Sequence, residues 1–310
     1  MKILITGALG HIGSYILQNI NKIKKIKEIY IIDDLSTQRY STLFNLRNSN
    51  KKIYFIQKDL STNNALKKFK KVDVVLNLAS ITEAAGSLKI KKKIYKINLG
   101  IFNNVLKYCK INSAKLIHIS STSVYGEQKG IVDEMCKYLN PKSPYAEIKL
   151  IEEKKLKAMR ENIKFISYRF GTISGFSSGM RFHTAVNKFC LNCSLGLPLP
   201  VWKGALDKPK PYLSLKDAFL VIKYTLEKNF YKNDVYNIFS ENLTLNTLIS
   251  YYKKHIKKIK IKYEVSKLIN QYPYEISNKK FNKEGFKLKS KINNDIQLTL
   301  EKFKYLSNEV

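Results

Sequence analysis

Short apolar runs alternate with segments of helical periodicity through the first part of the chain. Apolar runs of strand length occupy residues 2–6, 29–32, 53–57, 72–78, 116–120 and 165–169. Helical patterns lie between them at residues 13–21, 94–109 and 144–161, with weaker ones near residues 42–47 and 64–69. Such alternation is typical of a parallel sheet with helices on both faces. The sequence therefore predicts an α/β fold with a doubly wound parallel sheet.

The pattern changes after Gly171, where loops rich in glycine and proline interrupt the alternation. We expect a helix over residues 185–195, an irregular connection over 196–211, and a strand, helix and strand over 212–239 that return to the sheet. The sequence thus predicts a first domain of residues 1–170, rejoined at about 212–240. Residues 171–211 and 241–310 would form a smaller, substrate-binding lobe.

The first apolar run leads into three glycines, Gly7, Gly10 and Gly13, and then into a helical pattern. A strand that turns through glycines into a helix directs backbone N–H groups and the positive helix end at one place, which suits a diphosphate. A Cβ would block both the turn and the close approach of the ligand. The next apolar run ends in Asp33, at the spacing expected of an acid that binds a ribose.

Charge and composition narrow the function only slightly. The chain has 310 residues, 44% of them hydrophobic, and a formal net charge of +32. Its lysines are spread along the whole length, and the densest run, residues 253–262, lacks the aromatic residues of a base-stacking platform. We therefore expect no nucleic-acid partner, although the charge should attract anionic substrates.

The expected location is the cytoplasm. No apolar run approaches the roughly 18 residues of a membrane span, and the chain opens directly on a strand, which leaves no room for a signal peptide. Four scattered cysteines suit a reducing compartment better than a disulfide framework. Cys190 and Cys193 form a C-x-x-C pair without a second pair to complete a metal site, so we expect no metal and interpret them as packed in the lobe.

Two later segments carry candidate chemistry. Tyr145 and Lys149 are four residues apart on a predicted helix, so the phenol and the ammonium can point into one cleft. The ammonium should favour the phenolate and lower the tyrosine pKa towards working pH. Upstream, the strand at residues 116–120 runs into the hydroxyl residues Ser120 and Ser121, which could hold a reacting hydroxyl beside Tyr145.

With these motifs in this order, the chain resembles the extended short-chain dehydrogenase/reductases, in the branch of NAD-dependent nucleotide-sugar epimerases and dehydratases. UDP-glucose 4-epimerase is a representative of that branch. The resemblance covers nearly the whole chain. It implies an NAD-binding Rossmann domain, a nucleotide-sugar substrate and a homodimer formed through the helices that carry Asn98 and Tyr145.

The resemblance also implies the residues that bind the cofactor. Asp33 would accept hydrogen bonds from the adenosine ribose and repel a 2′-phosphate, which favours NAD over NADP. Lys149 would hold the nicotinamide ribose, and Phe170 would flank the nicotinamide. The cofactor-binding residues implied in this way are Gly7, Gly10, His11, Ile12, Gly13, Asp33, Asp34, Asp59, Leu60, Leu78, Ala79, Ser80, Asn98, Ser120, Tyr145, Lys149 and Phe170.

The same resemblance assigns the chemistry to Ser121, Tyr145 and Lys149, with Tyr145 as the acid/base. The implied substrate-binding residues are Thr82, Ser121, Thr122, Thr172, Arg181, Asn187 and Lys210. Further expectations concern single residues. Trp202 could stack near the base of the nucleotide or fill the lobe, and we favour filling. His118 should lie in the core or at the sheet edge, and the backbone of His11 should matter more than its ring. Gln271 and Tyr274 could face the nucleotide.

Departures from the family pattern restrict the reaction. Dehydratases of the family carry Asp-Glu directly after the catalytic hydroxyl residue, where this chain has Thr122 and Ser123, so dehydration is disfavoured. The remaining interpretation is oxidation at C4 of a nucleotide sugar through a 4-keto intermediate. This leads either to the 4-epimer, which we favour, or to release of the 4-keto sugar from a hexose or heptose. A non-catalytic dinucleotide sensor is a third reading, but such proteins typically lose the tyrosine or the lysine.

Overall fold

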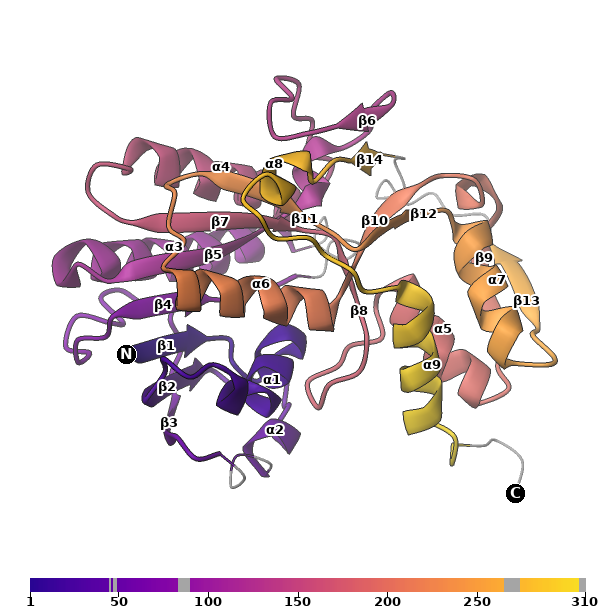
Figure 1. Ribbon diagram of the computed structural model, residues 1–310, viewed down its shortest axis with the longest axis horizontal. Coiled ribbons are helices and arrows are strands. Elements are labelled where there is room, and N and C mark those ends of the chain that lie inside the picture. The colour runs from indigo at the N-terminus through magenta and orange to yellow at the C-terminus, as the bar shows by residue number, and fades with distance from the viewer. Residues whose placement is uncertain (45, 47–48, 83–89, 265–273, 307–310) are drawn as a thin grey trace.

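A seven-stranded parallel sheet forms the centre of the protein (Figure 1). The structure, a computed structural model, describes residues 1–44, 46, 49–82, 90–264 and 274–306. The strand order is β11-β7-β5-β4-β1-β2-β3, and each neighbouring pair is parallel. The strands are β1 (Lys2–Thr6), β2 (Glu28–Asp33), β3 (Lys52–Gln57), β4 (Val74–Asn77), β5 (Lys115–Ser121), β7 (Phe165–Phe170) and β11 (Val235–Ile238). The predicted doubly wound sheet is confirmed, and its order reverses between β1 and β4.

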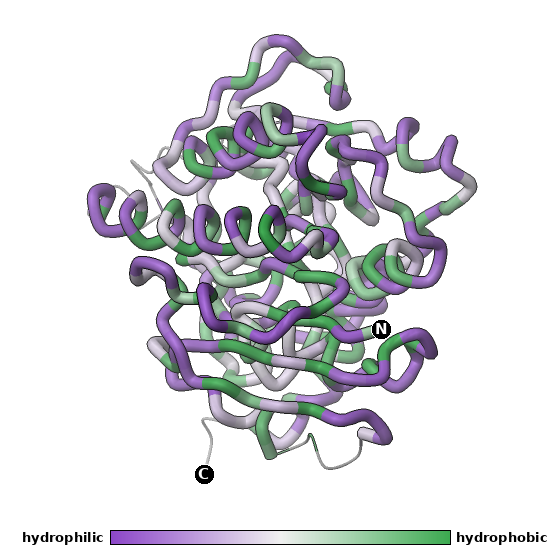
Figure 2. Tube along the Cα trace, turned by 90° about the vertical axis from the view of Figure 1, so that its left-hand side faces the viewer, coloured by the Kyte–Doolittle hydropathy of each residue, from purple (hydrophilic) through white to green (hydrophobic). Residues whose placement is uncertain are grey.

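Helices cover both faces of this sheet because its strands are apolar on both sides. On β1, Ile3 and Ile5 belong to one buried cluster, which includes residues of α1 and α6, whereas Leu4 belongs to a second cluster with residues of α3. The helices around the sheet are α1 (His11–Gln18), α2 (Ser41–Phe44), α3 (Lys91–Asn112), α4 (Pro144–Ala158) and α6 (Leu215–Lys228). Hydrophobic stretches run along the strands in Figure 2, and hydrophilic residues recur along the helices.

A second group of elements lies beyond the carboxyl ends of the strands (Figure 1). Three small sheets pair β12 (Glu241–Leu243), β10 (Lys210–Ser214) and β8 (Thr172–Ser174); β13 (Ile261–Glu264) and β9 (Leu199–Trp202); and β14 (Glu275–Ile276) and β6 (Ile131–Val132). The helices of this region are α5 (Ala185–Ser194), α7 (Leu245–His255) and α9 (Ile292–Lys302), whereas α8 (Lys279–Asn282) packs against β11 of the large sheet. A separate buried cluster unites α5, α7 and α9 and includes Cys190, with Cys193 packed against it, as the sequence predicted.

Two predicted elements differ from the structure. The strand expected near residue 212 does not join the large sheet, because β10 pairs with β8 and β12 instead. The return to the large sheet therefore consists of β11 alone, reached through α6. The weak helix expected at residues 64–69 is a series of turns, since Asn64 has a left-handed φ of 55° and Ala65 and Lys67 bond three residues back.

Short 3-10 helices follow helix α1 at η1 (Ile20–Lys22), strand β5 at η3 (Thr122–Tyr125) and strand β9 at η4 (Lys203–Ala205). Among the described residues, no helix is both long and apolar enough to cross a membrane.

Candidate active site

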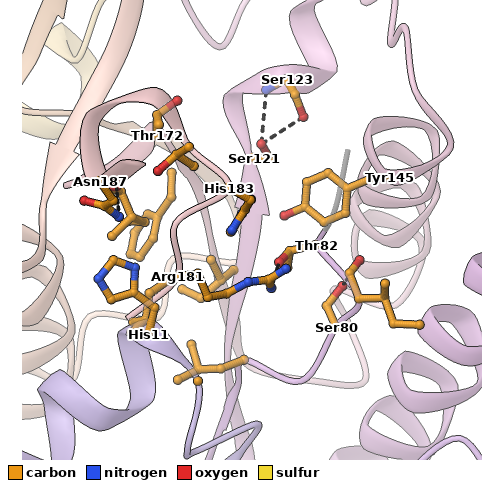
Figure 3. Close-up of a pocket in the computed structure, with 18 of the residues that line it drawn as sticks. His11, Ser80, Thr82, Ser121, Ser123, Tyr145, Thr172, Arg181, His183 and Asn187 are labelled. Atoms are coloured by element: carbon orange, nitrogen blue, oxygen red, sulfur yellow. Dashed lines mark hydrogen bonds between the residues drawn. The ribbon is translucent and has the colours of Figure 1, made fainter. Parts of the chain in front are cut away.

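A pocket of about 860 Å³ lies at the carboxyl ends of the central strands and extends to the smaller lobe (Figure 3). Every predicted site residue lines it except Asn98 and Lys149. The predicted residues that the pocket brings together are Gly7, Gly10, His11, Ile12, Gly13, Asp33, Asp34, Asp59, Leu60, Leu78, Ala79, Ser80, Thr82, Ser120, Ser121, Thr122, Tyr145, Phe170, Thr172, Arg181, Asn187 and Lys210.

The glycine turn forms one end of this pocket. Gly7 has a φ of +61°, and a Cβ built on it would lie 2.7 Å from the Ala79 backbone. Gly10 caps α1 with extended dihedral angles, and a Cβ on Gly13 would lie 2.4 Å from the Ala8 carbonyl oxygen. The positive end of α1 therefore opens onto the pocket without intervening side chains, which fits the diphosphate of a dinucleotide.

The carboxylate of Asp33 is fixed beside this turn. It accepts hydrogen bonds from the backbone N–H groups of Leu9 and Leu35, both at 3.1 Å. Burial raises the pKa of Asp33, and these two hydrogen bonds oppose that shift. The partly buried Arg39 also lines the pocket. It was not among the predicted residues, although its place six residues after Asp33 in the same loop was a usable signal.

Tyr145 enters the pocket from the first turn of α4. That turn is fixed by Ser143, whose hydroxyl accepts from the Ala146 N–H at 3.2 Å, and by Pro144 in the first helical turn. Figure 3 shows the phenol directed at the pocket, with Ser121 on one side and the Arg181 guanidinium and Thr82 on the other. The Ser121 hydroxyl interacts with the Tyr145 phenol and accepts from the Ser123 hydroxyl at 2.8 Å.

The expected lowering of the Tyr145 pKa is wrong. Burial raises the pKa of Tyr145, and the Glu152 carboxylate raises it further. Lys149, Ser121 and Arg181 all act in the opposite direction without reversing the shift. Burial is the largest cause of the raised pKa, and the Lys149 charge that would oppose it is shared with Glu152, which was not among the predicted residues.

Lys149 and Asn98 lie behind the pocket wall. The Lys149 ammonium donates to Glu152 Oε2 at 2.9 Å and lies 5.7 Å from the centre of the Tyr145 ring. The Asn98 amide donates to the Ile81 carbonyl and accepts from the Ile81 N–H, at 3.0 and 2.8 Å. Asn98 thus supports the loop that carries Ile81 and Thr82.

Polar and aromatic side chains form the end of the pocket that belongs to the lobe. Arg181 donates a hydrogen bond to Thr82, and the hydroxyls of Thr122 and Tyr274 lie 3.1 Å apart. Burial and the neighbouring Lys208 lower the pKa of Lys210 to about 8. The Asn187 amide donates to the Ile173 carbonyl at 3.4 Å.

Trp202 also lies at this end, and the expectation that it fills the lobe is wrong. It lines the pocket, is only partly buried, and its indole N–H donates to Glu264 at 3.3 Å. Of the two residues expected near the nucleotide, Tyr274 lines the pocket, and Gln271 lies outside the described residues.

Two histidines line the pocket without carrying charge at neutral pH. Burial lowers the pKa values of His11 and His183 to about 4. The His11 ring donates to the Gly175 carbonyl at 2.8 Å, so it acts through its side chain as well as its backbone. Nearby, the Ser14 hydroxyl donates a hydrogen bond to the Ser177 hydroxyl at 2.8 Å. These bonds attach the loop after β8 to the glycine turn.

Comparison with known proteins identifies the family. The family model of the NAD dependent epimerase/dehydratase family matches residues 3–238. A Bacillus subtilis protein described as an uncharacterized UDP-glucose epimerase is 33% identical over 197 residues, which is 61% of this chain and 62% of that protein. A Lactobacillus helveticus UDP-glucose 4-epimerase is 27% identical over a segment that covers 57% of this chain and 53% of that protein. The matched segments thus span less than two thirds of either relative.

Solved structures agree on the fold. The UDP-glucose 4-epimerase of Thermus thermophilus, solved with NAD, superposes with a TM-score of 0.83 at 21% identity, over 98% of this chain and 99% of that one. The UDP-glucuronic acid 4-epimerase of Bacillus cereus, solved with UDP-glucuronic acid and NAD, superposes with a TM-score of 0.84 at 25% identity, over 98% of this chain and 99% of that one. The chain therefore belongs to the NAD dependent epimerase/dehydratase family and is an enzyme whose cofactor is NAD.

Proposed function

We propose that this enzyme oxidises the C4 hydroxyl of a nucleotide-activated sugar and re-reduces the 4-keto intermediate on its other face, which makes it a nucleotide-sugar 4-epimerase. The observation that carries the proposal is the Tyr145 phenol, which interacts with Ser121 in the same pocket that the glycine turn enters. NAD, when bound, accepts a hydride from carbon and can return it. The named relatives and the fold support this choice of chemistry.

In this proposal Tyr145 removes the proton of the C4 hydroxyl and later returns it. Ser121 orients that hydroxyl, since its own hydroxyl lies beside the phenol. Lys149 stabilises the deprotonated phenol from behind the pocket wall, at 5.7 Å from the ring centre.

The cofactor would lie along the sheet side of the pocket. The glycine turn and the N-terminus of α1 suit its diphosphate, and Asp33 suits its adenosine ribose. Asp59 and Leu60 would bracket the adenine, and Phe170 would flank the nicotinamide.

The substrate would extend from Tyr145 to the lobe. Thr82, Thr122 and Thr172 would bind the sugar, and Arg181, Asn187 and Lys210 the sugar or the diphosphate. This assignment corresponds to a domain division in which residues 171–211 and 241–310 bind the nucleotide sugar. Dehydration remains disfavoured, because the two positions after Ser121 carry the hydroxyl residues Thr122 and Ser123 where dehydratases carry carboxylic acids.

We further propose a cytoplasmic homodimer joined through α3 and α4. These two long helices pack side by side on one face of the large sheet, and the family resemblance points to them. Light scattering at several protein concentrations tests the assembly, and a monomer at all of them would contradict it.

The experiment that tests the reaction is proton NMR of the purified enzyme with a panel of UDP-, GDP- and CDP-sugars. Appearance of the 4-epimer supports the proposal. A released 4-ketone would instead make the enzyme a nucleotide-sugar 4-dehydrogenase. If no sugar in the panel changes, although the enzyme binds NAD, the protein acts as a dinucleotide sensor and the proposal fails.

A further inference from the structure

A buried ionic cluster lies directly behind the Tyr145 phenol. Glu152 Oε2 lies 2.9 Å from the Lys149 ammonium and 3.3 Å from Nε2 of His118. Lys149, Glu152 and His118 are 4%, 2% and 0% exposed, so bulk water neither screens these charges nor forms hydrogen bonds with them. We call these three residues the Lys149–Glu152–His118 cluster. Such a buried carboxylate is strongly destabilising unless it is paired.

The adjacent acid on the same helix is already fully engaged. Glu153 accepts two hydrogen bonds from Arg169, at 2.9 and 2.7 Å, and one from the Ser120 hydroxyl at 2.6 Å. Arg169 in turn donates to the Tyr125 hydroxyl at 2.9 Å. Glu153 and Arg169 therefore balance each other's charge. This leaves Glu152 as the carboxylate that balances Lys149.

Glu152 consequently competes with the phenol for the same cation. With Lys149 paired to Glu152, the region behind the pocket is neutral while Tyr145 keeps its proton. Loss of that proton would place a second anion beside one ammonium in a medium of low dielectric constant, where such interactions are strong. The pKa of Tyr145 is raised by burial and, among the charged groups, by Glu152.

His118 lies against the carboxylate from strand β5. Burial lowers the pKa of His118 despite the Glu152 charge, so the ring is neutral, and its Nε2 lies 3.3 Å from Glu152 Oε2 without forming a hydrogen bond. The ring packs edge-on against Phe102 of α3, with ring centres 5.2 Å apart. Residues of strand β5 and helix α3 thus pack around the carboxylate.

We propose that Glu152 is a positioning residue: it holds the Lys149 ammonium behind the pocket wall and limits how strongly that charge stabilises the deprotonated form of Tyr145. The importance of this for turnover rests on the proposed function, whereas the electrostatic effect on the phenol does not. Glu152 is not a catalytic residue, because it does not line the pocket.

The other charged groups that face the cluster are accounted for. Glu153 on α4 is paired with Arg169 on β7. Arg181 approaches Tyr145 from across the pocket. Glu147, two residues after Tyr145, bonds to Tyr95 and Lys91 of α3 and is partly exposed. Glu147 therefore offers a matched control, a neighbouring acid on the same helix that does not pair with Lys149.

The test is a pH titration of the Tyr145 phenol in the whole protein, labelled with carbon-13 at the tyrosine Cζ atoms. Tyr145→Phe assigns the resonance, and circular dichroism defines the pH range in which each variant is folded. Glu152→Gln keeps the shape of the side chain and removes its charge. We expect the titration midpoint of Tyr145 to fall by about one pH unit, because Lys149 then faces the phenol alone. Glu147→Gln should leave the midpoint unchanged.

An unchanged or higher midpoint in Glu152→Gln would overturn the proposal. If that variant does not fold, Glu152→Asp replaces it, since it keeps the charge and withdraws the carboxylate by one methylene. A midpoint between wild type and the expected Gln value supports the proposal, and a wild-type midpoint refutes it. The titration requires neither substrate nor cofactor, so its outcome is separate from that of the product analysis.

Discussion

The two sides of the pocket are built in different ways. On the sheet side, functional groups are held by the backbone or by buried partners. Asp33 accepts hydrogen bonds from two main-chain N–H groups, and the helix that carries Tyr145 begins at a capped turn. On the lobe side, the groups are long side chains such as Arg181, Lys210 and Trp202. Short, fixed groups suit chemistry that needs accurate placement, whereas long ones suit a ligand whose shape varies.

In the proposed assignment, this difference would give one architecture a fixed end for the cofactor and a variable end for the substrate. The carboxyl ends of parallel strands cannot move independently, because each strand is bonded to its neighbours. The lobe has its own buried cluster around α5, α7 and α9, separate from the two clusters of the sheet. Substitutions on the sheet side should therefore abolish function, whereas substitutions on the lobe side should reduce it by varying amounts.

The largest effect is expected from Tyr145→Phe. Removal of the phenol hydroxyl should lower turnover by about 10²–10⁴-fold, the usual contribution of a positioned acid/base, while NAD binding is retained. Turnover by product NMR and NAD binding by calorimetry measure the two parts. Tyr138→Phe, at an exposed tyrosine, is the control and should behave as wild type. Retained turnover in Tyr145→Phe would refute the role given to the phenol.

The next largest effect is expected from Gly7→Ala. Any L side chain at a φ of +61° costs roughly 1 kcal/mol, and here the Cβ would also lie 2.7 Å from the Ala79 backbone. Gly130 has a φ of +81° but open space around its Cβ position, so Gly130→Ala isolates the conformational cost alone. Thermal unfolding and NAD affinity should both fall much further in Gly7→Ala. Equal losses in the two variants would mean that the close approach at Gly7 is unimportant.

The sequence predicted the sheet side almost completely because its information is local. Each strand, the glycine turn after β1 and the acid that ends β2 are runs of consecutive residues with a characteristic period or spacing. Even there the contact between Lys149 and Glu152 was missed. The i, i+3 spacing was visible, but only the structure shows that both residues are buried and that His118 of β5 faces them.

The lobe side could not be predicted as well, because its contacts join distant segments. Trp202 on β9 and Glu264 on β13 meet across 62 positions, and Thr122 meets Tyr274 across 152. No period or spacing in the sequence encodes such pairs. The strand near residue 212 was assigned to the wrong sheet for the same reason, since its partners β8 and β12 lie on either side of it in the chain.

A moderate effect is expected from Asp33→Asn, which tests the fixed carboxylate itself. Loss of the negative charge should weaken the exclusion of a 2′-phosphate and reduce the NAD/NADP affinity ratio by roughly tenfold, or about 1.4 kcal/mol. Asp34→Asn is the neighbouring control. Its carboxylate is exposed and bonded to Ser36, so it should change the ratio less. An unchanged ratio in Asp33→Asn would argue against the ribose contact.

The smallest effect is expected on the lobe side, at Lys210. Burial lowers the pKa of its ammonium to about 8, so the side chain is charged below that pH and loses its charge as the pH rises through it. Affinity for UDP should therefore fall by roughly three- to tenfold between pH 7 and pH 9, measured by calorimetry. Lys210→Met should bind UDP more weakly at pH 7 and lose most of this pH dependence, whereas the exposed Lys216→Met should keep it. If Lys210→Met retains the full pH dependence, the charge that responds belongs to another lobe residue, and the proposed diphosphate contact of Lys210 is wrong.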